Sequence, residues 1–364
     1  MNIIDYVANE QRTFSEYPIN QIDGLVLTKL SYFRLDNIKS DITKKLKYTI
    51  KELFKKEFFD DMYDKVTGGI DDNYNFLCQL CASRRYRDLE IIDHVDELDL
   101  DIEKQFSATT LAINKDLLFI AYRGTDSSLV GWKEDFNMSF ELGVPAQIRS
   151  VTYLDKISHR HKGKLILGGH SKGGNLSVYA ASMALESVKK QIDRIYSFDG
   201  PGFLPEFTCT KGYKQIFPKV EKYVPQASIV GLLMDAGAYK IIDAKSFSIL
   251  QHEPYNWIIE NGDYKYVESF SFSSIQFRET LNRWLTDVSC EKRQIIVDNI
   301  YNILSSAING QDKISLKTIQ DFSTNYNQLD SKDKSIMKEC ISLFIKDMMP
   351  DFKFKSFFNS SNNE

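Results

Sequence analysis

The sequence predicts an α/β fold built on a mostly parallel central sheet, and three observations support this prediction. Short apolar runs with strand character alternate with helical segments after residue 105. A Gly-x-Ser-x-Gly run at 169–173 lies between an expected strand and an expected helix. Helical patterns occupy both ends of the chain. We therefore expect a sheet covered on both faces, with N-terminal helices and a C-terminal helical appendage.

Strand character is clearest in the middle of the chain. The expected strands are 105–113, 117–122, 164–167, 194–198, 220–224 and 239–243. The second is nearly all apolar, which predicts burial on both faces of the sheet. Apolar residues at helical spacing predict helices at 41–59, 73–82, 291–304 and 332–349.

The element order suggests one large domain with an attachment. We expect residues 1–274 to form an α/β domain whose first segment, 1–60, is helical. Residues 275–350 are expected to form the helical appendage. The polar end of the chain predicts a disordered tail at 351–364.

Composition limits the partners and the compartment. The net charge of −4 over 364 residues gives no reason to expect nucleic acid or an anionic membrane surface. We find no apolar run near the ~20 residues that a transmembrane helix needs, and no secretory signal. Five scattered cysteines suit a reducing cytoplasm. The one close pair, Cys78 and Cys81, is expected to be core cysteines rather than a redox or zinc site.

The Gly-His-Ser-Lys-Gly run at 169–173 has the form of a nucleophile elbow, the sharp turn that presents a serine in α/β-hydrolases. A serine hydroxyl needs a base to accept its proton. In this fold the chain order is serine, acid, histidine. His252 is the only histidine after Ser171, and we expect it to be the base.

The acid is less sharply defined. Asp199 ends an expected strand and precedes Gly-Pro-Gly, which places it at the carboxyl edge of the sheet, so it is the preferred acid. Asp235 is the next choice, and Asp243 or no acid at all remain open. For the oxyanion we expect the backbone N–H groups of Lys172 and Thr125.

Two segments together resemble class 3 lipases. Residues 119–126, ending in Arg-Gly-Thr-Asp, and the Gly-Trp-Lys-Glu-Asp run at 131–135 resemble the "RGT…W…D" block of that family. Residues 169–174 resemble its elbow. The whole chain looks closer to a bacterial branch of the superfamily that is classed as a domain of unknown function. This branch shares the segments 197–203, 223–231 and 251–257.

The resemblance implies an α/β-hydrolase fold with Ser171, His252 and Thr125 in the roles above. The sequence departs from the lipase pattern at two positions. Lipases carry leucine where Lys172 stands, and a cation beside the nucleophile argues against a purely apolar acyl pocket. Their acid lies in an Asp-x-Val-Pro-like block, whose counterpart at 228–231 begins with Ser228.

The expected function is that of a cytoplasmic serine hydrolase that cleaves an ester of a lipid or a small acyl substrate. No metal or organic cofactor is expected. A degenerate hydrolase that binds a protein partner through its terminal helices is the alternative, and a thioesterase or peptidase on the same triad is another.

Overall fold

The central element of the computed structural model is an eight-stranded sheet. The structure describes residues 1–36, 48–63, 69–126, 129–234, 237–246, 248–295, 297–298, 301 and 331. The strands lie side by side in sequence order: β1 (Tyr48–Thr49), β2 (Glu90–Asp99), β3 (Lys104–Asn114), β4 (Leu117–Tyr122), β5 (Lys164–His170), β6 (Ile192–Phe198), β7 (Val220–Pro225) and β8 (Lys240–Ile242). The strands from β1 to β4 pair antiparallel, and those from β4 to β8 pair parallel. The predicted α/β fold with a mostly parallel sheet is confirmed.

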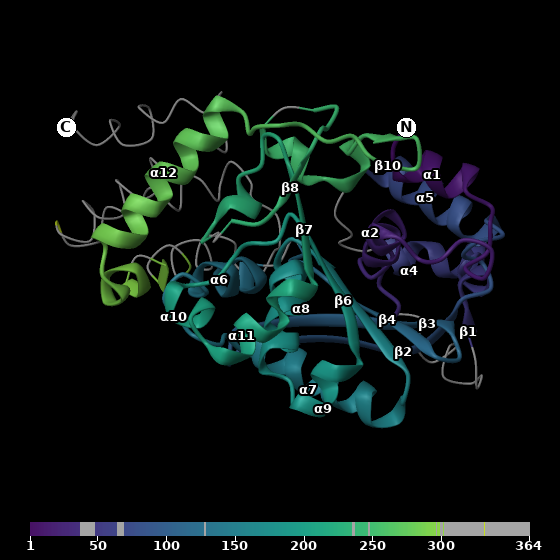
Figure 1. Ribbon diagram of the computed structural model, residues 1–364, viewed down its shortest axis with the longest axis horizontal. Coiled ribbons are helices and arrows are strands. Elements are labelled where there is room, and N and C mark those ends of the chain that lie inside the picture. The colour runs from purple at the N-terminus through teal and green to yellow at the C-terminus, as the bar shows by residue number, and fades with distance from the viewer. Residues whose placement is uncertain are drawn as a thin grey trace.

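Helices cover both faces of this sheet (Figure 1). One face carries α1 (Ile3–Asn9), α2 (Gln21–Leu30), α4 (Phe59–Tyr63) and α5 (Ile70–Ala82). The other carries α7 (Pro145–Arg160), α8 (Lys172–Met183), α9 (Glu186–Gln191) and α11 (Lys211–Ile216). The remaining described helices are α6 (Leu129–Asn137), α10 (Pro205–Thr208) and α12 (Phe272–Asp287). A short strand pair, β9 (Ile259–Glu260) and β10 (Asp263–Tyr264), lies outside the main sheet.

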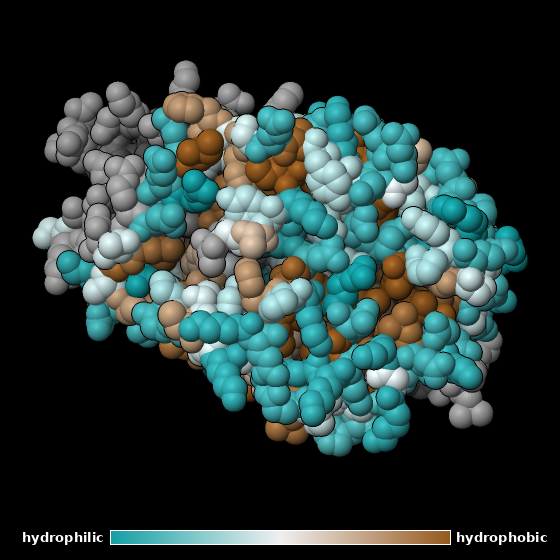
Figure 2. All heavy atoms as spheres, viewed as in Figure 1, coloured by the Kyte–Doolittle hydropathy of each residue, from teal (hydrophilic) through white to brown (hydrophobic). Residues whose placement is uncertain are grey.

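The central strands supply apolar side chains to two separate core layers. In β4, Phe119 and Ala121 pack with α1, α2 and α5, whereas Leu118 and Ile120 pack with α7 and α8. This alternation is the period of two that a strand imposes, and it explains why β4 is apolar throughout. Figure 2 shows hydrophilic residues over most of one face of the molecule, with hydrophobic residues visible in patches between them.

The N-terminal segment is part of this core. The Met1 amino group donates to the carbonyl oxygen of Ile259 at 3.0 Å, and the Ile259 N–H donates back to Met1. In α2, a Cβ added at Gly24 would lie 2.7 Å from the ring of Tyr196 on β6. Glycine therefore allows α2 to lie directly against the sheet.

The structure differs from the sequence-based expectations at two places in the first hundred residues. The described part of the helix expected at 41–59 instead contains β1 and the short 3-10 turns Ile50–Leu53 and Lys56–Phe58, because Tyr48 pairs with Ile91 of β2. The helix expectation for residues 41–47 lies outside the described residues. Strand β2 was not expected, since it carries many acidic residues of types that are rare in strands.

At the C-terminal end, α12 starts three residues before the expected appendage. Within the helix expected at 291–304, the described residues 291–295, 297–298 and 301 are helical. The helix expected at 332–349 and the tail expected at 351–364 lie outside the described residues. Among the residues that the structure does describe, no helix has the length and apolar character needed to cross a membrane.

Candidate active site

The nucleophile elbow connects β5 to α8 through Ser171, whose φ is 57° and ψ −133°. This is a strained conformation for a residue with a side chain. A Cβ at Gly169 would lie 2.0 Å from the carbonyl oxygen of Gly173, and one at Gly173 would lie 2.1 Å from that of Tyr122. Only glycine fits at these two positions. The Ser171 N–H donates to Phe198 at 3.0 Å, which fixes the turn at the carboxyl edge of the sheet.

Asp199 and His252 form a buried acid–imidazole pair at the same edge. Asp199 follows β6, and its carboxylate Oδ2 lies 2.7 Å from Nδ1 of His252. Its other oxygen, Oδ1, accepts from the Ser228 hydroxyl at 2.5 Å and from the Gly231 N–H at 3.1 Å. The Asp199 side chain is fully buried, and that of His252 is 25% exposed. With Nδ1 donating to the carboxylate, Nε2 is left as the proton acceptor of the imidazole.

The other candidate acids have no such contact among the described residues. Asp243 binds Lys265, with 3.0 Å between the carboxylate and the ammonium. Asp235 lies outside the described residues. The hydroxyl of Ser228, at the place of the lipase acid, donates to Asp199.

The loop that carries His252 is fixed on both sides. The Gln251 side chain accepts from the Ala227 N–H at 2.7 Å, and its backbone oxygen accepts from the indole of Trp257 at 2.8 Å. Glu253 accepts from the buried ammonium of Lys29 on α2 at 2.9 Å. These contacts hold the backbone of the histidine between them, and they make α2 a direct support of the site.

His170, the residue before Ser171, lies against His252, with 4.4 Å between the ring centroids and 34° between the ring planes. Its Nε2 lies 2.8 Å from the backbone oxygen of His252, and its Nδ1 lies 2.9 Å from the hydroxyl of Tyr32. Burial, and then the nearby His252, lower the pKa of His170 well below its usual value. A neutral ring in this setting donates from Nε2 to the backbone and accepts from the tyrosine.

The expected oxyanion loop follows β4 and lies next to the elbow. A Cβ added at Gly124 would lie 3.0 Å from Cβ of Ser171. The hydroxyl of Thr125 donates to Asp135 on α6 at 2.5 Å. Burial raises the pKa of Asp135 to about 6, although Lys172 and the Thr125 hydrogen bond lower it. The Asp135 side chain is still 36% exposed, so solvent screens part of this effect.

The side chain of Lys172 is not where the sequence suggested. Its ammonium is fully buried and binds both oxygens of Gln105, the backbone one at 3.0 Å and the side-chain one at 2.7 Å. It also lies 3.0 Å from the carboxylate of Glu134. The cation beside Ser171 is therefore held inside the protein by these partners.

One group of described residues has ligand atoms close enough for a metal ion: Asp36, His94 and Asp96, all within 4.8 Å of one another. However, Asp96 is bound by two guanidinium groups, those of Arg123 at 2.5 Å and Arg34 at 3.3 Å. Two cations beside the carboxylate disfavour a third. The group fits an ion-pair network better than a metal centre.

Of the two close cysteines, the buried Cys81 has a structural role. Cys78 and Cys81 are free thiols. Cys81 is buried, and its Sγ lies 3.2 Å from the backbone oxygen of Ile50. Burial raises the pKa of Cys81 to about 12, which keeps the thiol protonated and unreactive.

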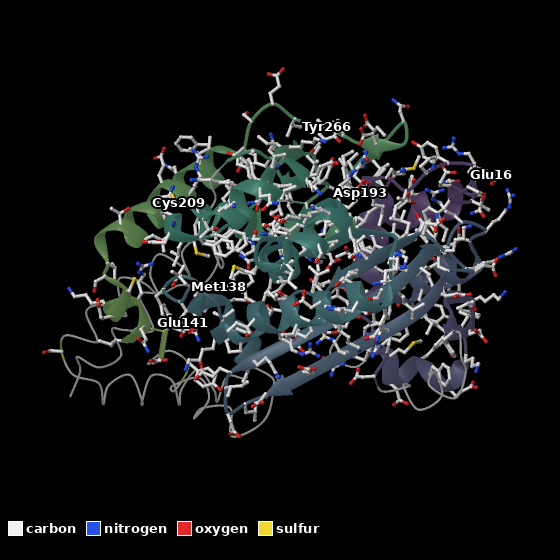
Figure 3. The ribbon with its side chains drawn as sticks, turned by 60° about the horizontal axis from the view of Figure 1, so that its bottom comes forward. Glu16, Met138, Glu141, Asp193, Cys209 and Tyr266 are labelled. Atoms are coloured by element: carbon white, nitrogen blue, oxygen red, sulfur yellow. The ribbon has the colours of Figure 1, made fainter. Side chains whose placement is uncertain are left out.

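A small hollow with a mainly apolar lining lies along α8, beyond the elbow. Asn175, one turn after Ser171, lines it together with Met138, Leu142, Tyr179, Phe203 and Phe207. The rings of Tyr179 and Phe207 stack with 4.9 Å between centroids. Met138 and Glu141, also in its lining, lie at the opposite end of the molecule from Glu16 (Figure 3).

Sequence reasoning missed three supporting residues of the site. His170 lies inside the elbow, next to Ser171, and its ring contacts that of His252. Glu134 and Asp135 both belong to the lipase-like run at 131–135, but the sequence does not show which residues they bind. Contacts between elements far apart in the chain define these roles, so spacing alone does not reveal them.

The sheet and elbow define an α/β-hydrolase fold. Residues 80–302 match the family model described as Mbeg1-like, so the chain belongs to the Mbeg1-like family. The resemblance to the class 3 lipase superfamily is thereby confirmed.

Among solved structures, the chain is similar to the Rhizomucor miehei lipase propeptide complex, with 15% identity over 64% of this chain and 80% of that chain and a TM-score of 0.37. It is also similar to the Lip2 lipase from Yarrowia lipolytica, with 15% identity over 43% of this chain and 66% of that chain and a TM-score of 0.32. A structure titled as a fungal lipase matches with 10% identity over 72% of this chain and 93% of that chain, with a TM-score of 0.40. No match to a curated protein was found.

Proposed function

We propose that this protein is a serine hydrolase that cleaves a carboxylic ester through an acyl-enzyme. Ser171 is the nucleophile, His252 the base and Asp199 the acid that orients it. The observation that carries the proposal is the 2.7 Å contact between Nδ1 of His252 and the buried carboxylate of Asp199, at the sheet edge that also carries the strained Ser171.

The reaction has two halves. The Ser171 oxygen attacks the ester carbonyl carbon while Nε2 of His252 takes the hydroxyl proton. The N–H groups of Lys172 and Thr125 stabilise the negative charge on the carbonyl oxygen. The bond to the leaving alcohol then breaks, and His252 gives the alcohol its proton. A water molecule, activated by the same histidine, releases the acid from the serine.

We propose a lipid or a small acyl ester as the substrate class, because the hollow along α8 is lined mainly by apolar and aromatic side chains. The cytoplasm remains the proposed location, and the four described cysteines are free thiols in keeping with it. No metal or organic cofactor has a part in this reaction scheme.

The experiment is hydrolysis of p-nitrophenyl esters of two to sixteen carbons by the wild type and by Ser171→Ala. We expect turnover by the wild type, a preference among chain lengths, and a loss of about 10⁴-fold or more in Ser171→Ala. Ligand binding without turnover of any ester would favour the degenerate binding module. Preferred turnover of thioesters or peptide amides would assign the same triad to another acyl substrate.

A further inference from the structure

The side chain of Lys172 extends into a buried polar network. Its ammonium has no solvent exposure and contacts Gln105 at the start of β3 and Glu134 on α6. An ammonium and a carboxylate lose much of their hydration on burial, and their mutual attraction often does no more than offset this cost. Stability alone is therefore a weak explanation for a charged pair at this position.

Glu134 also contacts the backbone at the starts of β3 and α7. Its Oε2 accepts from the Gln105 N–H at 3.0 Å as well as from the lysine. Its Oε1 accepts from the Ala146 N–H at the start of α7, at 2.7 Å. Charge-assisted hydrogen bonds are short and directional, so they fix Glu134 relative to β3, α7 and α8 together.

The residue that follows Glu134 on α6 touches the expected oxyanion loop. Asp135 accepts the hydroxyl of Thr125 at 2.5 Å, and its other oxygen lies 3.9 Å from the Lys172 ammonium. Glu134 and Asp135 are consecutive residues of one helix, and their carboxylates lie 3.0 and 3.9 Å from the Lys172 ammonium, so fixing the first at this point also fixes the second. The side chain of Lys172 thus holds α6, and α6 in turn positions Thr125.

We propose that Lys172 is a positioning residue of the oxyanion hole: its buried contact with Glu134 fixes α6, so that Asp135 holds Thr125 in register with the elbow. This inference rests on the proposed function, since it concerns the same site. An oxyanion hole acts only when its donors lie within about 2.7–3.1 Å of the developing charge. Leucine, which lipases carry here, fills space but makes no directional bond.

The matched variants are Lys172→Met, Glu134→Gln and, as the control, Lys133→Met. Lys133 is also on α6, is similarly buried, and binds Glu103 at 2.5 Å and Asp298 at 2.9 Å, so it anchors the helix away from the elbow. We expect kcat to fall about 10–100-fold in Lys172→Met, with KM changed less than about threefold, as for an interaction used only in the transition state. Lys133→Met is expected to stay within about threefold of the wild type.

An arylboronic acid, which forms a tetrahedral adduct with the serine, gives a readout that general destabilisation does not move. Its inhibition constant should rise in Lys172→Met by the same factor as kcat/KM falls, while the substrate KM stays nearly constant. If Lys172→Met does not fold, Glu134→Gln carries the same test, since it keeps the shape and removes the charge.

A double-mutant cycle with Asp135→Asn tests the route of the effect. If Lys172 acts through Asp135, the double variant is no slower than the slower single variant. Multiplied losses would overturn the proposal, as would a Lys172→Met enzyme with the kinetics of Lys133→Met. Failure of the proposed function is separate: the wild type itself would then neither turn over esters nor react with a fluorophosphonate.

Discussion

Replacing Asp199 by asparagine tests the acid of the proposed triad, and the contacts of the carboxylate predict the outcome. Oδ1 accepts from the Ser228 hydroxyl and the Gly231 N–H, so an amide at this position must place its oxygen there. Its NH₂ group then faces Nδ1 of His252. Nδ1 must become an acceptor, which moves the ring proton to Nε2 and leaves the serine without a base.

The opposite orientation of the amide is unfavourable. It would break the hydrogen bonds that Oδ1 now accepts from Ser228 and Gly231, at about 0.5–1.5 kcal/mol net for each, although Gly231 would keep its bond to the Ser228 oxygen at 3.0 Å. The inactive tautomer is therefore the more stable one. In serine proteases the same wrong tautomer lowers kcat by about 10⁴-fold, equivalent to about 5.4 kcal/mol of barrier.

The assay is kcat for a p-nitrophenyl ester, with thermal unfolding measured in parallel. Asp243→Asn is the control, because that carboxylate binds Lys265 and lies apart from the histidine contact. We expect a loss near 10⁴-fold in Asp199→Asn and less than about threefold in the control. A well-folded Asp199→Asn enzyme within tenfold of wild-type kcat would refute the assigned acid.

Three further predictions concern the supports of the triad. Ser228→Ala removes one donor to Asp199, and we expect kcat to fall about tenfold, a loss of the size of one charge-assisted hydrogen bond; an unchanged kcat would show that Gly231 alone suffices. His170→Phe removes both hydrogen bonds of a buried ring, so kcat and melting temperature should both fall, and more than in Tyr32→Phe, which leaves the contact between the ring and the His252 backbone in place; equal effects would contradict the positioning role of the ring. Asp135 has a pKa of about 6 in the folded protein, compared with an ordinary value of 3.8. Between these two pH values the folded protein binds more protons than the unfolded chain. The stabilisation from this group is therefore present below pH 3.8 and is lost as the pH rises through 6. Asp135→Asn should therefore gain stability relative to the wild type at pH 8 compared with pH 4, measured by urea unfolding; a constant difference would contradict this.

The sheet and elbow were predictable because local patterns determine them. Strand β4 is apolar on both faces, and glycines at 169 and 173 fit only a turn with close backbone contacts. Strand β2 could not be predicted, because its acidic residues bind cations from other elements, as Asp96 binds Arg123. Local propensity disfavours such a strand, and tertiary contacts override it.

In the candidate site, too, local patterns predict some residues, whereas only tertiary contacts reveal the others. The order of Ser171, Asp199 and His252 along the chain could be interpreted directly, since the fold places strand ends at one edge. The residues that support the site could not be predicted, because their contacts join segments far apart in the chain. Lys29 binds Glu253, and the ring of His170 binds both Tyr32 and the backbone of His252. For Lys172, the sequence shows a cation beside the nucleophile, but only the fold shows that it points into the core.

The central claim is that Ser171 becomes acylated. The most direct test is mass spectrometry of peptides from the full-length protein after reaction with a fluorophosphonate, run on the wild type and on Ser171→Ala. A single adduct is expected on the peptide that contains Ser171 in the wild type, and none in the variant. Equal labelling of the two proteins, or an adduct on another residue, would contradict it.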